Sequence, residues 1–267
     1  MANFAAIVCA RERKLGTELR RGTLYLSSET HHSVAKSAKL AGILPDRVRA
    51  IPVDAAFRMR IDRLADAIAT DRAAGLTPFL VVSSAGTTNT GAVDPLREIA
   101  ALCLQEGLWH HVDGAYGASF HLCPELRPLL AGLPEADSLT LDPHKGLFIP
   151  YGTGAVLVRD GEALRAAHSE TASYMPEDRA GTEFYDPHQF GPDLSRNFRG
   201  LPVWLAIKLY GAARYRAALA EKRALALDAA KRIAALPHVV MDAPPQLSLF
   251  AFHLEWPGAT LAEQDAA

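Results

Sequence analysis

Apolar runs alternate with helical stretches along the first 160 residues of the chain. Short runs rich in apolar and β-branched residues predict strands at 23–27, 48–53, 78–85, 109–114, 138–142 and 154–160. Helical spacing of apolar residues predicts helices at 2–15, 32–42, 61–75 and 94–107. The predicted strands are apolar throughout rather than alternating, so both of their faces should be covered. The pattern indicates an α/β fold with a mostly parallel sheet covered by helices.

After residue 160 the periodicity changes. Residues 161–200 mix Gly, Pro, His and acidic residues without regular spacing, which predicts a long irregular segment. Residues 201–236 predict a long helix, straight or bent, and LSLFAFHLEW at 247–256 predicts a final strand. Because little chain follows this strand, we expect 201–267 to hold a connecting helix and only the beginning of a second, smaller domain.

Composition narrows the class of protein. The 267 residues are 49% hydrophobic and 22% charged with a formal net charge of −2, which gives no electrostatic reason to expect nucleic acid or an anionic membrane as a partner. Cys9, Cys103 and Cys123 lack metal-ligand spacing, and their odd number disfavours a disulfide framework. No apolar run is long enough for a transmembrane helix, and FAAIVCA near the N-terminus does not resemble a signal peptide. We therefore expect a cytoplasmic protein.

Polar residues follow the ends of three predicted strands, at Ser83–Thr90, Asp113 and Lys145. Sites in parallel sheets gather at the carboxyl ends of the strands, so these residues should lie together. A buried Asp113 needs a partner, which could be a helix terminus, an arginine or a protonated ring nitrogen. Lys145 could be an ordinary exposed lysine, or a partly desolvated amine that acts as a nucleophile. An amine that forms a Schiff base and a carboxylate for a ring nitrogen are what a pyridoxal phosphate enzyme needs.

Four segments carry a resemblance to a known family. DPHKGLFIPYGTGAVLVRD (142–160) and HHVDGAYGASF (110–120) resemble the lysine and aspartate segments of group II pyridoxal phosphate-dependent decarboxylases, which include the aromatic-L-amino-acid and glutamate decarboxylases. SSETHHSVAKSAKLAGI (27–43) resembles the segment of the histidine that stacks on the cofactor, and SSAGTTNTGAVDPL (83–96) resembles a loop beside it. The resemblance implies a type I aminotransferase-like fold with a pyridoxal phosphate-binding large domain at 1–200.

The resemblance implies a role for each matching residue. Lys145 would form the Schiff base with the cofactor, Asp113 would pair with the pyridinium nitrogen, and Ala115 would pack against the ring. The family pattern T-H-x-S favours His31 as the stacking histidine. His32 is the alternative, and either could instead be a surface residue at a helix N-terminus.

Further roles follow from the same resemblance. Thr87 would lie beside the cofactor, although its hydroxyl could simply stabilise a turn. Asp142 and His144 would lie near the phosphate. The helix that begins in SRNFRGLPVW follows a loop that, in the family, supplies a protonating tyrosine. Tyr185 is the first candidate for this catalytic residue and Tyr174 the second, with an ordinary loop aromatic as the alternative.

The implied activity is decarboxylation of an L-amino acid to an amine, with an aromatic substrate slightly favoured and a homodimer as the full-length form. Asp142 and Gly146 depart from the asparagine and tryptophan of the animal aromatic decarboxylases, which weakens any substrate assignment. The family's phosphate-binding turn precedes the helix at 2–15, where the sequence starts, so we expect weakened cofactor binding. The alternatives are another pyridoxal phosphate-dependent lyase of the same fold, or an inactive remnant that binds a partner.

Overall fold

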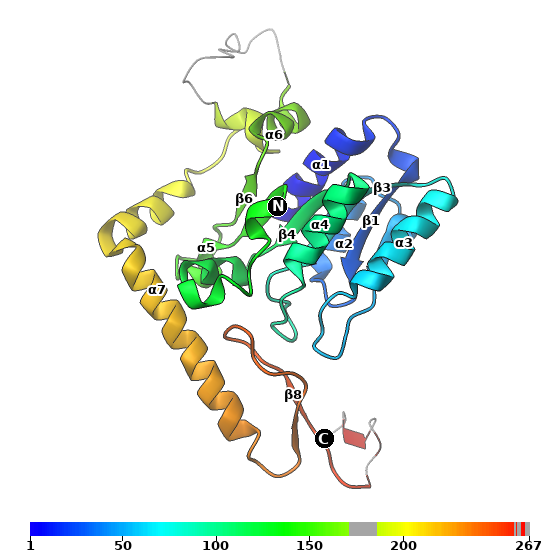
Figure 1. The fold of residues 1–267 in the computed structure, drawn as a ribbon. Helices are drawn as coiled ribbons and strands as arrows, with labels where there is room; N and C mark the ends of the chain where they lie inside the picture. The colour runs from blue at the N-terminus through cyan, green and yellow to red at the C-terminus, as the bar shows by residue number, and fades with distance from the viewer. Residues whose placement is uncertain (171–185, 259, 261–262, 265–267) are drawn as a thin grey trace.

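The protein was analysed as a computed structural model that describes residues 1–170, 186–258, 260 and 263–264. Its centre is a six-stranded sheet flanked by helices (Figure 1). The strands of this sheet are β1 (Gly22–Ser27), β2 (Val48–Ile51), β3 (Thr77–Ser84), β4 (Trp109–Asp113), β5 (Ser138–Leu141) and β6 (Ala155–Val158). The helices are α1 (Ala2–Leu15), α2 (His32–Leu40), α3 (Ile61–Ala73), α4 (Leu96–Glu106), α5 (Pro143–Gly146), α6 (Gly161–His168) and α7 (Gly200–Ile233).

The strand order is β2-β1-β3-β4-β5-β6, and every neighbouring pair is parallel except the antiparallel pair β5–β6. The chain leaves β1 to one side for β2 and returns to the other side for β3. Such a reversal opens a crevice at the carboxyl ends of the strands, where ligands bind in open α/β sheets. The predicted α/β fold with a mostly parallel sheet is confirmed.

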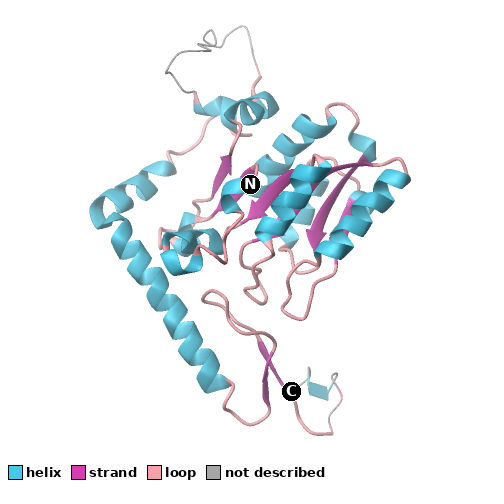
Figure 2. Ribbon diagram, viewed as in Figure 1, coloured by secondary structure: helices cyan, strands magenta, loops and turns pink. Residues whose placement is uncertain are grey.

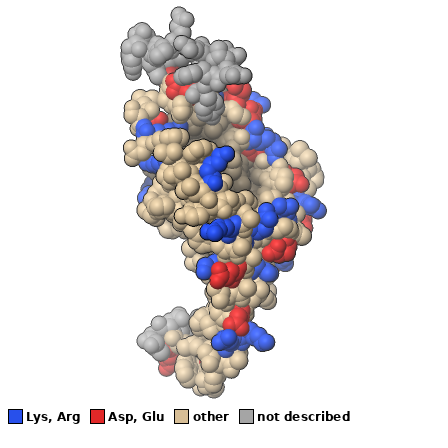
Figure 3. Space-filling model, turned by 90° about the vertical axis from the view of Figure 1, so that its left-hand side faces the viewer, with Lys and Arg blue, Asp and Glu red and all other residues tan. Residues whose placement is uncertain are grey.

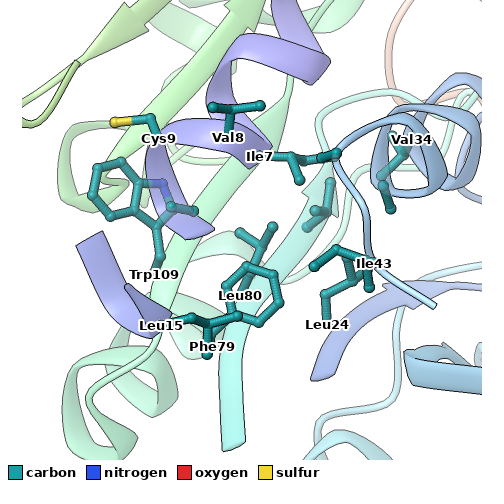
Figure 4. Close-up of a cluster of buried hydrophobic side chains, with 14 of the residues drawn as sticks. Ile7, Val8, Cys9, Leu15, Leu24, Val34, Ile43, Phe79, Leu80 and Trp109 are labelled. Carbon is teal, nitrogen blue, oxygen red and sulfur yellow. The ribbon is translucent and has the colours of Figure 1, made fainter. Parts of the chain in front are cut away.

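Both faces of the sheet are buried, which explains the unbroken apolar strands. On one face, Ile7 and Val8 of α1 pack with Leu24 and Leu80 of the sheet, and Figure 4 shows this cluster. On the other face, α3 and α4 cover the sheet through a second cluster that includes Leu64 (Figure 2). Leu24, Leu64 and Leu80 have no exposed surface. Burial of such side chains stabilises a fold by about 1.5–3 kcal/mol each.

The segment after β6 is more regular than predicted. Residues 161–168 form α6 rather than an irregular segment, because Asp160 caps the helix by accepting from the backbone N–H groups of Glu162 and Ala163. Ala163 and Leu164 then join the core cluster on the α1 face. A short 3-10 helix follows at Pro187–Phe190.

The C-terminal part departs from the sheet. Helix α7 extends along one side of the molecule and carries a bend at Gly211, whose φ of 74° and ψ of 155° suit glycine alone (Figure 1). The strand predicted at 247–256 is mostly wrong, since only β8 (Phe252–Leu254) is extended, and it pairs with an unpredicted strand, β7 (Val239–Met241). No described helix has both the length and the apolar character needed to cross a membrane.

Candidate functional site

A cavity of about 230 Å³ lies at the carboxyl ends of the parallel strands. It brings together six of the residues singled out in the sequence, which are His31, Thr87, Asp113, Ala115, Asp142 and Lys145. They come from the segments that follow β1, β3, β4 and β5, so the topology alone explains why residues more than a hundred positions apart meet. The expected location of the site is therefore supported by the cavity.

Asp113 is the last residue of β4 and is only 8% exposed. Its Oδ2 accepts a hydrogen bond from the Asn3 side-chain amide at 2.9 Å, and its Oδ1 accepts from the backbone N–H of Ala115 at 3.2 Å. No arginine or lysine forms an ion pair with it in the part of the chain that the structure describes. The Asp113 carboxylate therefore has only neutral hydrogen-bond donors, and because an unpaired buried charge is costly, a cationic ligand would stabilise it.

Lys145 lies on α5, a four-residue helix that follows β5 directly. Pro143 occupies the first turn, where its missing N–H costs nothing. The Lys145 Nζ lies 3.1 Å from Asp142 Oδ2, and its side chain is 46% exposed. The amine is thus open to the cavity and has a carboxylate beside it.

The histidines after β1 differ in position. His31 lines the cavity and is partly buried, whereas His32 is exposed and does not line it. The His31 Nδ1 lies 2.8 Å from the Ser33 hydroxyl, which orients the ring. Burial lowers the pKa of His31, with a smaller contribution from His32, so its ring is more readily neutral than an exposed histidine. The geometry favours His31 over His32 for contact with a ligand.

Thr87 belongs to the loop that follows β3, and its side chain stabilises a turn. Its hydroxyl lies 2.8 Å from that of Thr90 and accepts from the backbone N–H of Ala92 at 3.1 Å. Thr87 nevertheless lines the cavity. The turn contact is thus observed, while a place beside a cofactor stays a prediction.

A segment far along the chain packs against this loop. The Tyr116 hydroxyl lies 2.7 Å from the Ser248 hydroxyl, and Gln246 Oε1 accepts from the backbone N–H of Val93 at 2.7 Å. Leu247 has no exposed surface and lies near Gly86. Residues 246–248 thus support the floor of the site instead of forming the predicted strand, because their side chains fill the space beside the glycine-rich loop.

His144, which was predicted near the phosphate, does not line the cavity. His144 donates from Nδ1 to the carbonyl oxygen of Thr153 at 2.6 Å, and its Nε2 lies 3.8 Å from Asp142 Oδ2. Tyr185 and Tyr174 lie outside the described residues. Their proposed catalytic role stays a prediction.

Two polar residues next to Asp113 were not singled out in the sequence, and one of them, Asn3, lines the cavity itself. Asn3 is 8% exposed and His111 is fully buried, and the His111 Nε2 lies 3.0 Å from Asn3 Oδ1. His111 precedes Asp113 by two positions on one strand, so the period of two places both on the same face. Asn3 is the one polar residue in the apolar first part of α1, residues 2–10, which was a usable signal.

Comparisons with known proteins agree with this geometry. The conserved domain of pyridoxal-dependent decarboxylases matches residues 9–255. An aromatic-L-amino-acid decarboxylase of Bacillus atrophaeus is 40% identical over 82% of this chain and 46% of its own length. A tyrosine decarboxylase of Oryza sativa subsp. japonica is 36% identical over 96% of this chain and 50% of its own length.

A solved structure extends the likeness to three dimensions. The crystal structure of Oryza sativa TDC with PLP and tryptamine superposes with a TM-score of 0.93 at 29% identity, covering 99% of this chain and 57% of that chain. The chain spans about half the length of the curated relatives it matches. With the family domain matched over nearly all of its residues, the chain belongs to the pyridoxal-dependent decarboxylase family.

Proposed function

We propose that this chain provides the cofactor-binding half of a pyridoxal phosphate-dependent decarboxylase that converts an L-amino acid to an amine and carbon dioxide. The observation that carries the proposal is the cavity in which a buried, unneutralised carboxylate, Asp113, and an accessible amine, Lys145, meet at the carboxyl ends of β4 and β5. These are the two groups that the cofactor's ring nitrogen and aldehyde require.

The residues present fit the cofactor. Lys145 would attach it, the Asp113 carboxylate would accept from its ring N–H, and His31 would lie against its ring, with Ala115 leaving room for it. Bound in this way, pyridoxal phosphate supplies an electron sink for the bond that breaks when carbon dioxide leaves. The negative charge of Asp113 favours the protonated ring nitrogen, which strengthens that sink.

Asp142 suits a different role from the one the resemblance implied. Two anions repel each other, so a carboxylate is a poor neighbour for a phosphate group. Its Oδ2 lies 3.1 Å from the Lys145 Nζ. We therefore propose that Asp142 holds the lysine amine in place until the cofactor arrives.

An aromatic L-amino acid is the favoured substrate within this proposal. The Bacillus relative carries the name of an aromatic-L-amino-acid decarboxylase and the Oryza relative that of a tyrosine decarboxylase. Another lyase reaction on the same cofactor is the second candidate, because Lys145 and Asp113 would serve either.

Cofactor titration followed by product analysis tests the proposal. Adding pyridoxal phosphate should produce the visible absorbance band of a lysine-bound cofactor, and Lys145→Ala should abolish it. An unchanged spectrum in that variant would contradict the assignment of Lys145 as the residue that attaches the cofactor. Incubation with L-tryptophan, L-tyrosine and L-glutamate should then yield an amine and carbon dioxide from an aromatic substrate. Cofactor binding without any amine would favour the second candidate, and failure to bind would favour a partner-binding remnant.

A further inference from the structure

The buried side of Asp113 is held by a fully satisfied amide. Asn3 donates from Nδ2 to Asp113 Oδ2 at 2.9 Å and to the Ser33 hydroxyl at 3.3 Å. Its Oδ1 accepts from the Thr140 hydroxyl at 2.7 Å and lies 3.0 Å from His111 Nε2. A carboxylate only accepts, so the amide nitrogen of Asn3 must face Asp113 and its oxygen must face His111.

This orientation determines the tautomer of His111. Since Asn3 Oδ1 is an acceptor, His111 Nε2 carries the proton and donates to it. His111 Nδ1 must then accept, and it lies 2.8 Å from the Ser138 hydroxyl. That hydroxyl accepts from the indole N–H of Trp109 at 2.8 Å, which leaves its own proton free for His111. These hydrogen bonds form a series that runs from Trp109 through Ser138, His111 and Asn3 to Asp113. Each residue in it donates to the next one, in the direction of Asp113.

The series is electrically neutral. Burial lowers the pKa of His111 to about 4, so the ring carries no charge at neutral pH. A lysine or arginine in place of Asn3 would neutralise Asp113 and remove its attraction for a cation. A neutral amide instead fixes the direction of the carboxylate while leaving its charge available.

We propose that Asn3 and His111 are positioning residues that hold the Asp113 carboxylate in the orientation that binds the ring nitrogen of the cofactor. The inference rests on the proposed function, because it needs Asp113 to face that nitrogen. Asn3 comes from α1, while His111 and Asp113 share β4, so the first turn of the helix becomes part of the site. Neither residue needs to touch the cofactor to act.

A pair of ligands isolates this role from general stability. Pyridoxal phosphate and its analogue with a carbon in place of the ring nitrogen differ only at the atom that Asp113 would bind. Asn3→Ala should weaken binding of pyridoxal phosphate about tenfold or more, the range for a lost hydrogen bond to a charged group. Binding of the carbon analogue should stay unchanged, because it has no ring N–H to align. Dissociation constants from absorbance titrations give both values.

Further variants keep the test decisive. If Asn3→Ala fails to fold, His111→Leu replaces it in the test, because this change removes the donor that orients Asn3. It should lower the preference for pyridoxal phosphate over the carbon analogue. His111→Gln retains an N–H donor and should keep part of the preference for pyridoxal phosphate that His111→Leu loses. His110→Gln is the matched control, because His110 is equally buried on β4 but faces Ser83 instead, at 2.8 Å. It should lower the melting temperature without changing the ratio of the two affinities.

The possible failures are distinguishable. A wild-type protein that binds no pyridoxal phosphate, or binds both ligands equally, would overturn the proposed function and this inference together. A wild-type protein that prefers pyridoxal phosphate, with Asn3 and His111 variants that lose affinity for both ligands by the same factor, would overturn the inference alone.

Discussion

At the scale of single residues, Gly146 shows how closely the lysine segment is packed. A Cβ at this position would overlap the Ser119 side chain, so no larger residue fits without moving α5 or the segment that contains Ser119. Lys145 is its direct neighbour on the same short helix. The position and direction of the amine therefore depend on the absence of a side chain next to it.

We expect Gly146→Ala to destabilise the fold by about 1–3 kcal/mol, the usual cost of overpacking, and to weaken pyridoxal phosphate binding by displacing Lys145. Gly161→Ala is the control, because a Cβ there meets nothing within 4 Å. Urea unfolding and cofactor titration measure both effects. Equal stability and equal affinity in the two variants would show that the Ser119 contact relaxes without consequence.

At the scale of secondary-structure elements, a buried ion pair joins α3 to the edge of the sheet. Asp71 on α3 is 4% exposed and accepts from Arg49 of β2, with Arg49 Nη2 at 2.6 Å from Asp71 Oδ1. The Tyr25 hydroxyl of β1 donates to Asp71 Oδ2 at 2.8 Å. The arginine lowers the pKa of Asp71 against the opposing effect of burial, so the carboxylate stays charged. One side chain thus links three elements.

Asp71→Asn should lower the free energy of unfolding by about 1.5–3 kcal/mol, because hydrogen bonds to the charged group are lost while Arg49 stays partly buried. Asp228→Asn breaks an exposed pair with Arg232 and should change stability by less than about 0.5 kcal/mol. Chemical denaturation of the two variants compares them directly. If Asp71→Asn lowered the free energy of unfolding no more than Asp228→Asn does, the Arg49 guanidinium would be solvated in the variant without a cost in stability.

The two histidines of β4 give the fold a pH dependence. Burial lowers the pKa of His110 to about 3 and that of His111 to about 4, from an ordinary 6.5. Their contribution to stability is therefore complete above pH 6.5 and is lost as the pH falls through these values. Asp94 acts in the opposite sense, because burial raises its pKa to about 6 and its contribution is lost as the pH rises through that value.

The histidines outnumber the aspartate, and burial lowers the pKa of His31 and of His121 as well, so unfolding should take up protons between about pH 6 and pH 4. Each proton taken up lowers the free energy of unfolding by about 1.4 kcal/mol per pH unit, so stability should fall as the pH is lowered over that range. Urea unfolding at pH 6.0, 5.0 and 4.5 measures the slope. A double His110→Gln and His111→Gln variant should make the slope shallower, and an unchanged slope in that variant would assign the dependence to other groups.

At the scale of the whole molecule, the N-terminal half of α7 and the segment before it leave an extended apolar surface uncovered. Its exposed side chains are Leu194, Phe198, Leu201, Trp204, Leu205, Ile207, Leu209 and Tyr210. Figure 3 shows this side of the molecule, where wide uncharged areas separate the acidic and basic side chains. Surfaces of this kind mark interfaces in folded proteins. They support the homodimer as a proposal, and the expected division of the chain near residue 200 also stays a proposal.

A charge in this surface should break the proposed dimer. Trp204 is 57% exposed, and Trp204→Glu should shift the sedimentation of the protein from dimer toward monomer, because an interface would bury the carboxylate. Leu104→Glu on α4 is the control, since its side chain is 85% exposed outside this surface and should leave the mass unchanged. A wild-type protein that sediments as a monomer at every concentration would contradict the proposal.

Much of the fold was predictable because the information is local. Apolar runs and helical spacing located the first six strands and the helices α1 to α4 within one or two residues, since each element must bury its own face. The prediction of irregular structure failed at residues 161–168, and the prediction of a strand at 247–256 mostly failed, in both cases for tertiary reasons. Helix α6 is stabilised by a cap at Asp160 and by packing on α1, and residues 246–248 are held by Tyr116 and Val93 from distant parts of the chain.

The same division applies to the site. The sequence by itself determined the residue types, their order and the strand ends at which Lys145, Asp113 and His31 lie, because a residue at a strand end follows from the strand pattern. Only the tertiary structure placed His31 rather than His32 at the cavity, turned His144 toward the Thr153 carbonyl oxygen, and brought Asp142 within 3.1 Å of the Lys145 amine. These outcomes depend on side-chain directions and on contacts across the fold. Neither is encoded in local spacing, so the arrangement around Asp113 became visible only once the chain was folded.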